Sequence, residues 1–132
     1  MQCFRASIVI ASVDLDRLVA FYARLLGREP HLHWPQRYAE FHQNGLTLGL
    51  FRPQASQGAE FEAPQAGSLS LCLEVVDLDQ AIAHLGSLGY PPPGPVLTAS
   101  HGREIYAYDP DGNRLILHQA SPAVDPSSEA AP

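Results

Sequence analysis

Apolar residues alternate with other residues in several short segments of the chain, and this period of two predicts β-strands. The segment 4–11 is the first of them, and the segment 69–75 repeats its arrangement. In both segments one strand face is more aliphatic, and the other carries smaller or polar side chains. The expected members of that second kind of face are Ser7 and Val9 in the first segment, and Ser70, Cys72 and Glu74 in the second.

Each of these strands is followed by a helical pattern, in which apolar residues recur at intervals of three and four. The phrase Val-Asp-Leu-Asp starts both helices, at 13–16 and again at 76–79. An aspartate is a natural N-cap, and a glycine is a natural helix end. The expected caps and ends are Asp14 and Gly27 for the first helix, then Asp77 and Gly89 for the second. The repeated phrase indicates that one structural unit occurs twice.

Three short strands are expected after each helix. They are 31–34, 38–43 and 46–51 in the first half, and 96–98, 104–108 and 114–118 in the second. Asn44-Gly45 predicts a tight hairpin, and the segment 109–113 combines proline, Asx and glycine turn signals. The predicted fold class is therefore α+β. We expect two βαβββ modules that form a cup-shaped mixed sheet, with the helices on its outer face.

Changes in composition mark the boundaries between these parts. A stretch of Gln, Ala, Gly and Glu without periodicity predicts a linker, and a Ser-, Pro- and Ala-rich end predicts a mobile tail. The expected parts are a first module at 1–53, a linker at 54–67, a second module at 68–119 and a tail at 120–132.

Composition narrows the class of protein. The formal net charge of −6 argues against nucleic-acid binding, and no run approaches the roughly 20 apolar residues of a membrane span. The N-terminus lacks the charged and apolar regions of a signal peptide. Two cysteines make no disulfide framework, so we expect a cytoplasmic protein. Of the two, Cys72 is expected to be a small core residue of its strand.

Several motifs resemble those of the vicinal oxygen chelate superfamily, which includes glyoxalases, extradiol dioxygenases, fosfomycin-resistance enzymes and bleomycin-resistance proteins. The matching motifs are the two Val-Asp-Leu-Asp helix starts, the helix segment 21–27 and the turn and strand at 108–115. The resemblance covers nearly the whole chain, from Phe4 to Gln119. It implies the paired-module fold that the alternation also predicts.

The resemblance implies four positions for metal ligands on the concave sheet face. In this sequence they are Ser7, Gly49, Ser70 and Ile116. Zinc, iron and manganese need imidazole, carboxylate or thiolate donors, and none of these four side chains supplies one. A shift of two residues along the strands offers at most one imidazole and one thiol. We therefore expect no metal and no other cofactor, as in the bleomycin-resistance-like branch of binding proteins.

Other side chains are candidates for contacting a ligand. His118 is a candidate base or hydrogen-bonding group, or else a histidine at the frayed end of its strand. Trp34 offers a stacking face to a planar ligand, although a core position is the favoured interpretation. Tyr106 and Tyr108 point either into the cup or toward the helices. The expected ligand-binding set is Ser7, Val9, Trp34, Gly49, Ser70, Cys72, Glu74, Tyr106, Ile116 and His118.

Two features leave alternatives open. His31 and His33 alternate, so they are expected to face the same way, either as a surface pair, which is favoured, or as a metal-binding pair. Glu74 either pairs with a cationic ligand or lies in water at the mouth of the cup.

We expect a metal-independent small-molecule-binding protein of the glyoxalase/bleomycin-resistance type, which sequesters an aromatic or planar ligand in the cup or in a dimer groove. The alternative is a metal-dependent lyase or dioxygenase-like enzyme of the same superfamily with atypical ligands, or one that works without metal and uses His118 as base. A module whose cup is filled by its own side chains is the third hypothesis. Exposed sheet edges favour a homodimer.

Overall fold

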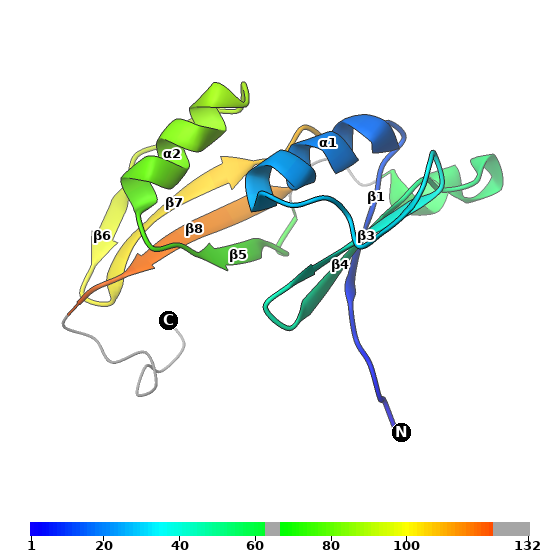
Figure 1. The fold of residues 1–132 in the computed structure, drawn as a ribbon, viewed down its shortest axis with the longest axis horizontal. Coiled ribbons are helices and arrows are strands. Elements are labelled where there is room, and N and C mark those ends of the chain that lie inside the picture. Colours follow the sequence, from blue (N-terminus) through cyan, green and yellow to red (C-terminus); the bar gives the residue numbers. More distant parts are fainter. Residues whose placement is uncertain (63–66, 123–132) are drawn as a thin grey trace. The chain divides into compact units, whose positions relative to one another are not determined.

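The computed structural model of the protein describes residues 1–62 and 67–122. They belong to two compact units, Met1–Pro64 and Gln65–Pro132. Residues 63–66 of the predicted linker and residues 123–132 of the predicted tail lie outside the described residues. Each unit has its own sheet and its own α-helix (Figure 1).

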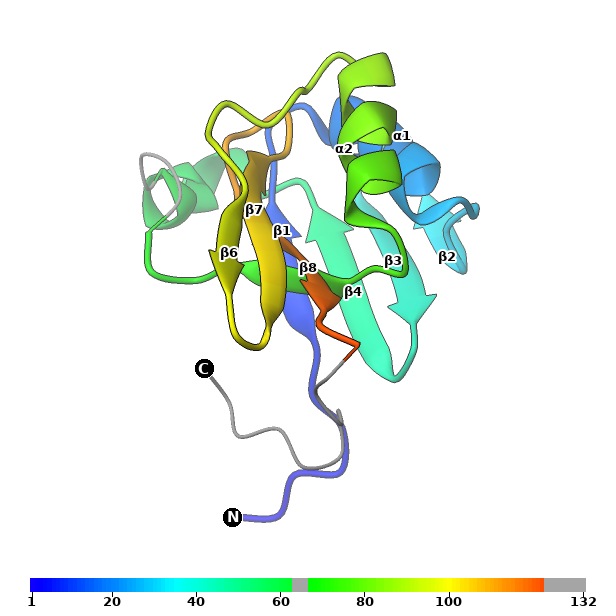
Figure 2. The same ribbon diagram turned by 90° about the vertical axis from the view of Figure 1, so that its left-hand side faces the viewer.

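The first unit contains a four-stranded mixed sheet with an α-helix on one face. Its elements are β1 (Ile8–Ala11), α1 (Leu15–Leu26), β2 (Leu32–Trp34), β3 (Tyr38–Gln43), β4 (Leu46–Phe51) and the 3₁₀-helix η1 (Ala55–Phe61). The strand order is β1-β4-β3-β2, with β1 parallel to β4 and the other neighbours antiparallel. Figure 2 shows β3 and β4 side by side as the two long arrows of this sheet.

The second unit repeats this arrangement. Its elements are β5 (Leu71–Glu74), α2 (Leu78–Ser87), β6 (Leu97–Ala99), β7 (Gly102–Tyr108) and β8 (Arg114–Ala120). The strand order is β5-β8-β7-β6, again with the first strand parallel to the last, and α2 lies along one face (Figure 1). The predicted α+β class and the βαβββ order of each half are confirmed. That the two sheets together form a cup stays a prediction.

Alternation along the strands divides the first sheet into a face against α1 and an open face. The side chains on the helix side are at most 2% exposed, namely Ala39 and Phe41 of β3 and Leu48 and Leu50 of β4. Helix α1 contacts both strands and contributes the fully buried Leu18 and Tyr22. Burying one large apolar side chain stabilises a fold by about 1.5–3 kcal/mol, so this layer holds the unit together.

The second sheet is built by the same rule. Its helix-facing layer is at most 3% exposed and consists of Ile105 and Ala107 of β7 and Leu115 and Leu117 of β8. Helix α2 contacts β8 and adds the fully buried Leu78 and Leu85. The intervening residues of both strands therefore point to the open face of this sheet.

The predicted helix caps are confirmed. Asp14 Oδ1 accepts a hydrogen bond from the Arg17 N–H at 3.3 Å, and Asp77 Oδ1 accepts one from the Gln80 N–H at 3.0 Å. Gly27 ends α1 in the left-handed conformation, with a φ of 68° that suits glycine. Among the described residues, no helix combines the length and the apolar character that a membrane crossing requires.

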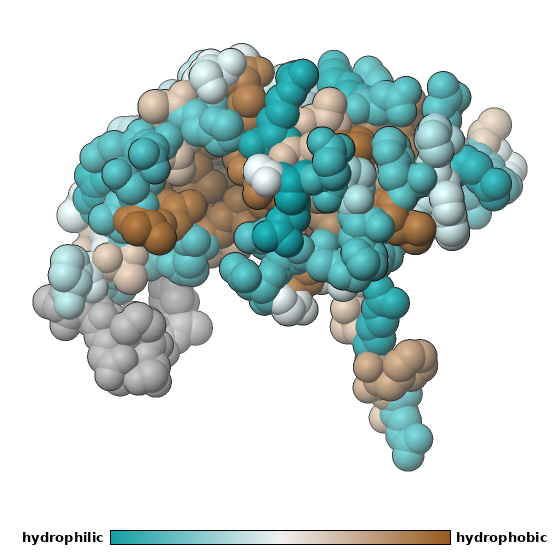
Figure 3. Space-filling view, viewed as in Figure 1, coloured by the Kyte–Doolittle hydropathy of each residue, from teal (hydrophilic) through white to brown (hydrophobic). Residues whose placement is uncertain are grey.

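Two features near the ends of the first unit differ from the predictions. Strand β1 starts at Ile8, opposite Leu48, rather than at residue 4, which the same register would place opposite the turn at Asn44. The segment before β1 has no helix or strand and projects from the unit as an extended chain (Figure 3). The predicted linker contains η1, whose start is tied by a hydrogen bond from the Gln54 N–H to Gln57 Oε1 at 3.3 Å.

Boundaries in the second unit also shift. Strands β7 and β8 are longer than predicted, because they pair with each other along their whole length, from Gly102 opposite Ala120 to Tyr108 opposite Arg114. Strand β6 starts and ends one residue later than expected. Helix α2 ends at Ser87, and the left-handed Gly89 follows two residues later with a φ of 92°.

Gly102 is a position that only glycine fits, since its φ is +146° and an added Cβ would lie 2.2 Å from the Gln119 backbone oxygen. We predict that Gly102→Ala lowers the free energy of unfolding of the second unit by about 2 kcal/mol or more. Gly86→Ala in α2 is the matched control, because nothing lies within 4 Å of its Cβ and alanine favours a helix by about 1 kcal/mol. Urea unfolding followed by circular dichroism compares them, and equal stability of the two variants would contradict the prediction.

Candidate functional site

The open face of the first sheet brings together side chains from all its strands. Cross-strand register puts Val9, Gly49, Glu40 and Leu32 in one row of this face. The adjacent row contains Ala11, Phe51, Tyr38 and Trp34. Ser7 directly precedes β1 and is exposed. Three residues of the predicted ligand-binding set, Val9, Gly49 and Trp34, therefore share a face with several side chains that the set did not include.

Glu40 is the centre of a hydrogen-bonded cluster on this face, which we call the Glu40 cluster and which also contains Tyr38, His42 and Arg5. Tyr38 Oη donates to Glu40 Oε2 at 2.6 Å. Glu40 Oε1 lies 2.7 Å from His42 Nε2 and accepts a hydrogen bond from Arg5 Nη2 at 3.1 Å. The Glu40 side chain is only 13% exposed, so its carboxylate exchanges most of its water for these three partners.

These partners determine the charge state of the Glu40 cluster. Hydrogen bonds from Tyr38 and then from His42 lower the pKa of Glu40 from 4.5 to about 2, against the opposing effect of burial. Burial, and then the hydrogen bond to Glu40, raise the pKa of Tyr38 from 10.0 to about 12. The cluster therefore keeps an ionised carboxylate beside a protonated phenol throughout the neutral range.

The absence of a side chain at Gly49 leaves room for the Tyr38 ring. A Cβ at Gly49 would lie 2.9 Å from Tyr38 Oη and 3.2 Å from a ring carbon. The Tyr38 ring therefore lies over Gly49, the position at which the family resemblance implies an acidic metal ligand. The acid of this face comes instead from the neighbouring strand, since Glu40 is the register partner of Gly49.

Aromatic rings lie beside the Glu40 cluster. The ring centroids of Trp34 and Tyr38 are 5.9 Å apart, and those of Phe51 and Phe61 are 5.1 Å apart in an edge-on arrangement. Trp34 is 54% exposed and Phe61 is 46% exposed. The favoured prediction that Trp34 is a core residue is therefore wrong. Its strand β2 lies at the sheet edge, and α1 packs against the other face.

The open face of the second sheet has a different character. One row contains Cys72, Ile116 and Tyr106, and the next contains Glu74, His118, Glu104 and Leu97. Tyr106 is 41% exposed, and alternation puts Tyr108 on the same face, so both tyrosines point away from α2.

Cys72 is exposed, so the prediction that it is a core residue is wrong. Its strand neighbour Leu71 takes the buried position, and a period of two then turns Cys72 to the open face. Partial burial of the thiol, followed by the negative charges of Glu74 and Glu104, raises the pKa of Cys72. The thiol is thereby kept protonated and a weak nucleophile at neutral pH.

His118 is held between two polar partners on this open face. Its Nδ1 lies 2.7 Å from Glu74 Oε2, and its Nε2 lies 3.1 Å from His101 Nδ1. Because a carboxylate only accepts hydrogen bonds, Nδ1 of His118 donates to Glu74, and in the neutral ring Nε2 accepts from His101. The side chain is 14% exposed and β8 continues to Ala120, so His118 does not lie at a frayed strand end.

The four positions that the resemblance implies for metal ligands hold no strong donor. Ser70 Oγ accepts a hydrogen bond from Arg114 Nη1 at 3.3 Å, while Gly49 and Ile116 lie on the open faces and Ser7 precedes its strand. Within residues 1–62 and 67–122, no group of three or more His, Cys, Asp or Glu side chains is arranged to hold a metal ion.

His31 has a partner that the alternation did not predict. It precedes β2, and its ring stacks on His42 at a centroid distance of 4.1 Å. His33 lies inside β2 opposite Ala39, on the other side of the strand from Trp34. His31 therefore stacks on His42 rather than pairing with His33. Through this stack it contacts the Glu40 cluster, to which His42 belongs.

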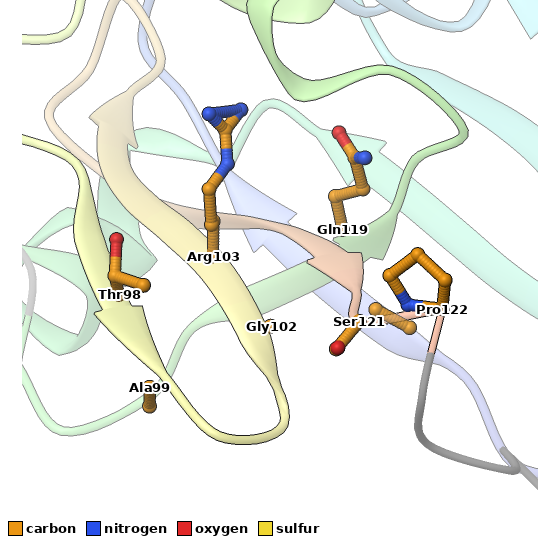
Figure 4. Close-up of a pocket in the computed structure, with 8 residues that line it drawn as sticks. Thr98, Ala99, Gly102, Arg103, Gln119, Ser121 and Pro122 are labelled. Carbon is orange, nitrogen blue, oxygen red and sulfur yellow. The ribbon is translucent and has the colours of Figure 1, made fainter.

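A hollow of about 230 Å³ lies at the end of the second sheet (Figure 4). Two polar side chains in its lining hold the start of α2 on the sheet. Gln119 Oε1 accepts a hydrogen bond from the Leu78 N–H at 2.7 Å, and Arg103 Nη2 pairs with Asp79 Oδ1 at 3.2 Å. Both polar groups already bind the first turn of α2 and its start. We therefore interpret the hollow as a consequence of how α2 packs on the sheet.

The predicted residue set missed the Glu40 cluster, although the sequence contains a signal for it. Tyr38, Glu40 and His42 alternate with the apolar Ala39 and Phe41 along the predicted strand 38–43. That pattern indicates three polar side chains on one face. The contribution of Arg5 has no such local signal, because it lies 35 residues from Glu40 in the sequence.

We predict that Tyr38→Phe raises the pKa of Glu40 from about 2 toward 4.5, because the Tyr38 hydrogen bond is the largest cause of its depression. Since the folded-state pKa lies below the unfolded one, the stabilisation from this carboxylate is complete above pH 4.5 and disappears as the pH falls through 2. Carbon-13 NMR titration of the carboxyl group measures the shift. Tyr106→Phe, in the other unit, is the control, and an unchanged Glu40 pKa in Tyr38→Phe would refute the assignment.

The sequence matches the family model of the Glyoxalase/Bleomycin resistance protein/Dioxygenase superfamily over residues 6–117. Among curated proteins, none matches this chain.

Three solved structures illustrate the proteins that share this fold. A glyoxalase-related enzyme from Fulvimarina pelagi is 22% identical with a TM-score of 0.71, over 89% of this chain and 88% of that one. Lactoylglutathione lyase from Agrobacterium tumefaciens is 23% identical with a TM-score of 0.67, over 90% and 96%. Fosfomycin resistance protein FosX from Mesorhizobium loti is 17% identical with a TM-score of 0.67, over 92% and 96%. The match over residues 6–117 means that the chain belongs to the glyoxalase/bleomycin resistance protein/dioxygenase superfamily.

Proposed function

We propose that this protein is a metal-independent small-molecule-binding member of its superfamily, and that it sequesters an aromatic or planar ligand. The observation that carries the proposal is the exposed aromatic surface on the open face of the first sheet. Trp34 and Phe61 are each about half exposed there, and each contacts a second ring, Tyr38 and Phe51 respectively.

Exposed aromatic rings of this kind suit a flat ligand. Offset or edge-on ring pairs contribute about 0.5–1.5 kcal/mol beyond their buried area, and burying the rings themselves adds to this. The rings are also held in place before a ligand binds, because Trp34 packs against Tyr38 and Phe61 packs against Phe51. A pre-arranged surface loses little side-chain entropy on binding, which favours affinity.

The chemistry of the implied metal positions supports binding without a metal. Two of them carry a glycine and an isoleucine, and the serines at the other two are weak ligands. Glu40, the register partner of Gly49, already has three hydrogen-bonding partners. A metal ion bound by both carboxylate oxygens would displace the hydrogen bonds from Tyr38 and His42.

Acid–base catalysis at His118 is a second candidate function, which the Glu74–His118–His101 chain favours. A carboxylate that fixes the tautomer of an imidazole is the arrangement by which enzymes orient a general base. In this hypothesis the protein is a lyase or dioxygenase-like enzyme, with atypical metal ligands or none. Because His118 Nε2 already accepts a hydrogen bond from His101, a substrate proton would bind at His101 Nε2 while His101 Nδ1 transfers its own proton to His118 Nε2.

We further propose a cytoplasmic homodimer. Both cysteines are free thiols, which fits a reducing compartment. Each sheet has two edge strands, β1 and β2 in the first unit and β5 and β6 in the second, and unpaired edges favour pairing with another copy.

Trp34 provides a direct test of the function, because it is the single tryptophan of the chain. We expect planar aromatic compounds to quench its fluorescence and to raise the melting temperature of the wild-type protein, since a ligand of the native state must stabilise it. Trp34→Ala should lose the thermal shift, and Trp34→Phe should retain most of it. His33→Ala is the control, because His33 lies on the other side of the same strand.

A screen without any thermal shift would contradict the proposed function. Elemental analysis of protein purified without chelator tests its metal independence separately. Zinc, iron or manganese at one ion per chain would favour the enzyme hypothesis, and loss of that metal in His118→Ala would place the ion on the second sheet.

Light scattering tests the assembly. We expect a mass of twice 14.3 kDa for the homodimer. A mass of one chain at micromolar concentration would overturn the dimer and leave the ligand-binding proposal to its own tests.

A further inference from the structure

We propose that the ligand of the first unit carries a planar cationic group, of the amidinium or guanidinium type, beside its aromatic ring, and that this group binds Glu40 in the place that Arg5 now occupies. The inference rests on the proposed function, because it assigns a charge to the planar ligand. The Arg5 guanidinium is then a displaceable stand-in for the cation of the ligand.

The three partners of Glu40 are not equally fixed. Tyr38 and His42 belong to the same strand as Glu40, and Gly49 and the His31 ring hold them in position. Arg5 comes from the extended segment before β1, in which every residue is exposed. Its side chain is 57% exposed, compared with 13% for Glu40. Arg5 is therefore the partner that can leave without disturbing the sheet.

The energy of the Arg5 contact is small enough for exchange. Ion pairs with a solvent-exposed partner contribute little to stability, because water screens the charges and the long side chain loses entropy. A single contact, from Nη2 to Glu40 Oε1 at 3.1 Å, joins the two side chains. A ligand amidinium that keeps this hydrogen bond and also rests on an aromatic ring has more to gain than the arginine does.

The surroundings of Glu40 fit such a ligand. Alternate residues of a strand are about 7 Å apart, so the Tyr38 ring lies within one small-ligand length of the carboxylate. The Trp34 ring is next to Tyr38, and more than half of its surface is available. A ring resting on Trp34 and Tyr38 can therefore direct a cationic substituent toward Glu40 Oε1. The pKa of Glu40, lowered to about 2, keeps the required negative charge at neutral pH.

Benzamidine and benzamide form the probe pair for a test, because they share a shape and differ in charge. Titrations followed by Trp34 fluorescence and by NMR should give tighter binding of benzamidine by about tenfold, the size of one charge-assisted hydrogen bond. Arg5→Gln should strengthen benzamidine binding about two- to fivefold, by removal of the competing ion pair, and leave benzamide unchanged. Glu40→Gln should reduce benzamidine to the affinity of benzamide.

Arg52→Gln is the matched control for Arg5→Gln, because it removes the same charge from an exposed residue of the same unit. Equal affinity for the two probes, or weaker benzamidine binding in Arg5→Gln, would overturn the inference while the proposed function stands. Failure of every planar aromatic to bind would instead overturn the proposed function. If Glu40→Gln does not fold, the Arg5→Gln and Arg52→Gln comparison decides alone, since both substitutions lie at exposed positions.

Discussion

The period of two along each β-strand is the constraint on which the rest of this structure depends. Helix α1 or α2 covers one face of each sheet, so a residue next to a buried aliphatic position must point to the open face. Glu40 lies between Ala39 and Phe41, which are fully buried, and it is thereby presented beside Gly49. His118 follows Leu117, which is 1% exposed, in the same way. The polar chemistry of the protein is a consequence of where its apolar side chains are buried.

The two open faces show how one duplicated unit can acquire two kinds of chemistry. On the first face a carboxylate is surrounded by hydrogen-bond donors and aromatic rings, which hold it ionised without any metal. On the second face two carboxylates, two imidazoles and a thiol lie close together. In each module the two positions that the family resemblance implies for metal ligands are taken by residues that are weak donors or none. Polar side chains lie beside them, one register step or one strand away. Recognition by rings and fixed charges is the chemistry that we propose for this arrangement.

Local patterns predicted most of the fold. Asp14 and Asp77 cap their helices, and Asn44 and Gly45 adopt the positive φ values of a tight hairpin, because caps and turns depend on residues a few positions apart. The predictions were wrong for Cys72 and Trp34, where apolar character was interpreted as burial. Both residues are apolar enough for a core but lie on the face without an α-helix, and hydropathy alone does not distinguish the two faces of a strand.

The sequence by itself determined the α-helices and β-strands, their order and which residues of a strand share a face, since these follow from spacing within a few residues. Only the tertiary structure decided which side chains meet across strands. The Arg5–Glu40 ion pair joins residues 35 positions apart, and the His118–Glu74 contact joins residues 44 positions apart. Such contacts depend on strand order and register, which the packing of whole sheets against their helices selects. That is why the sequence could place Tyr38, Glu40 and His42 on one strand face, whereas the contact of Arg5 with Glu40 and the lowered pKa of Glu40 followed only from the folded chain.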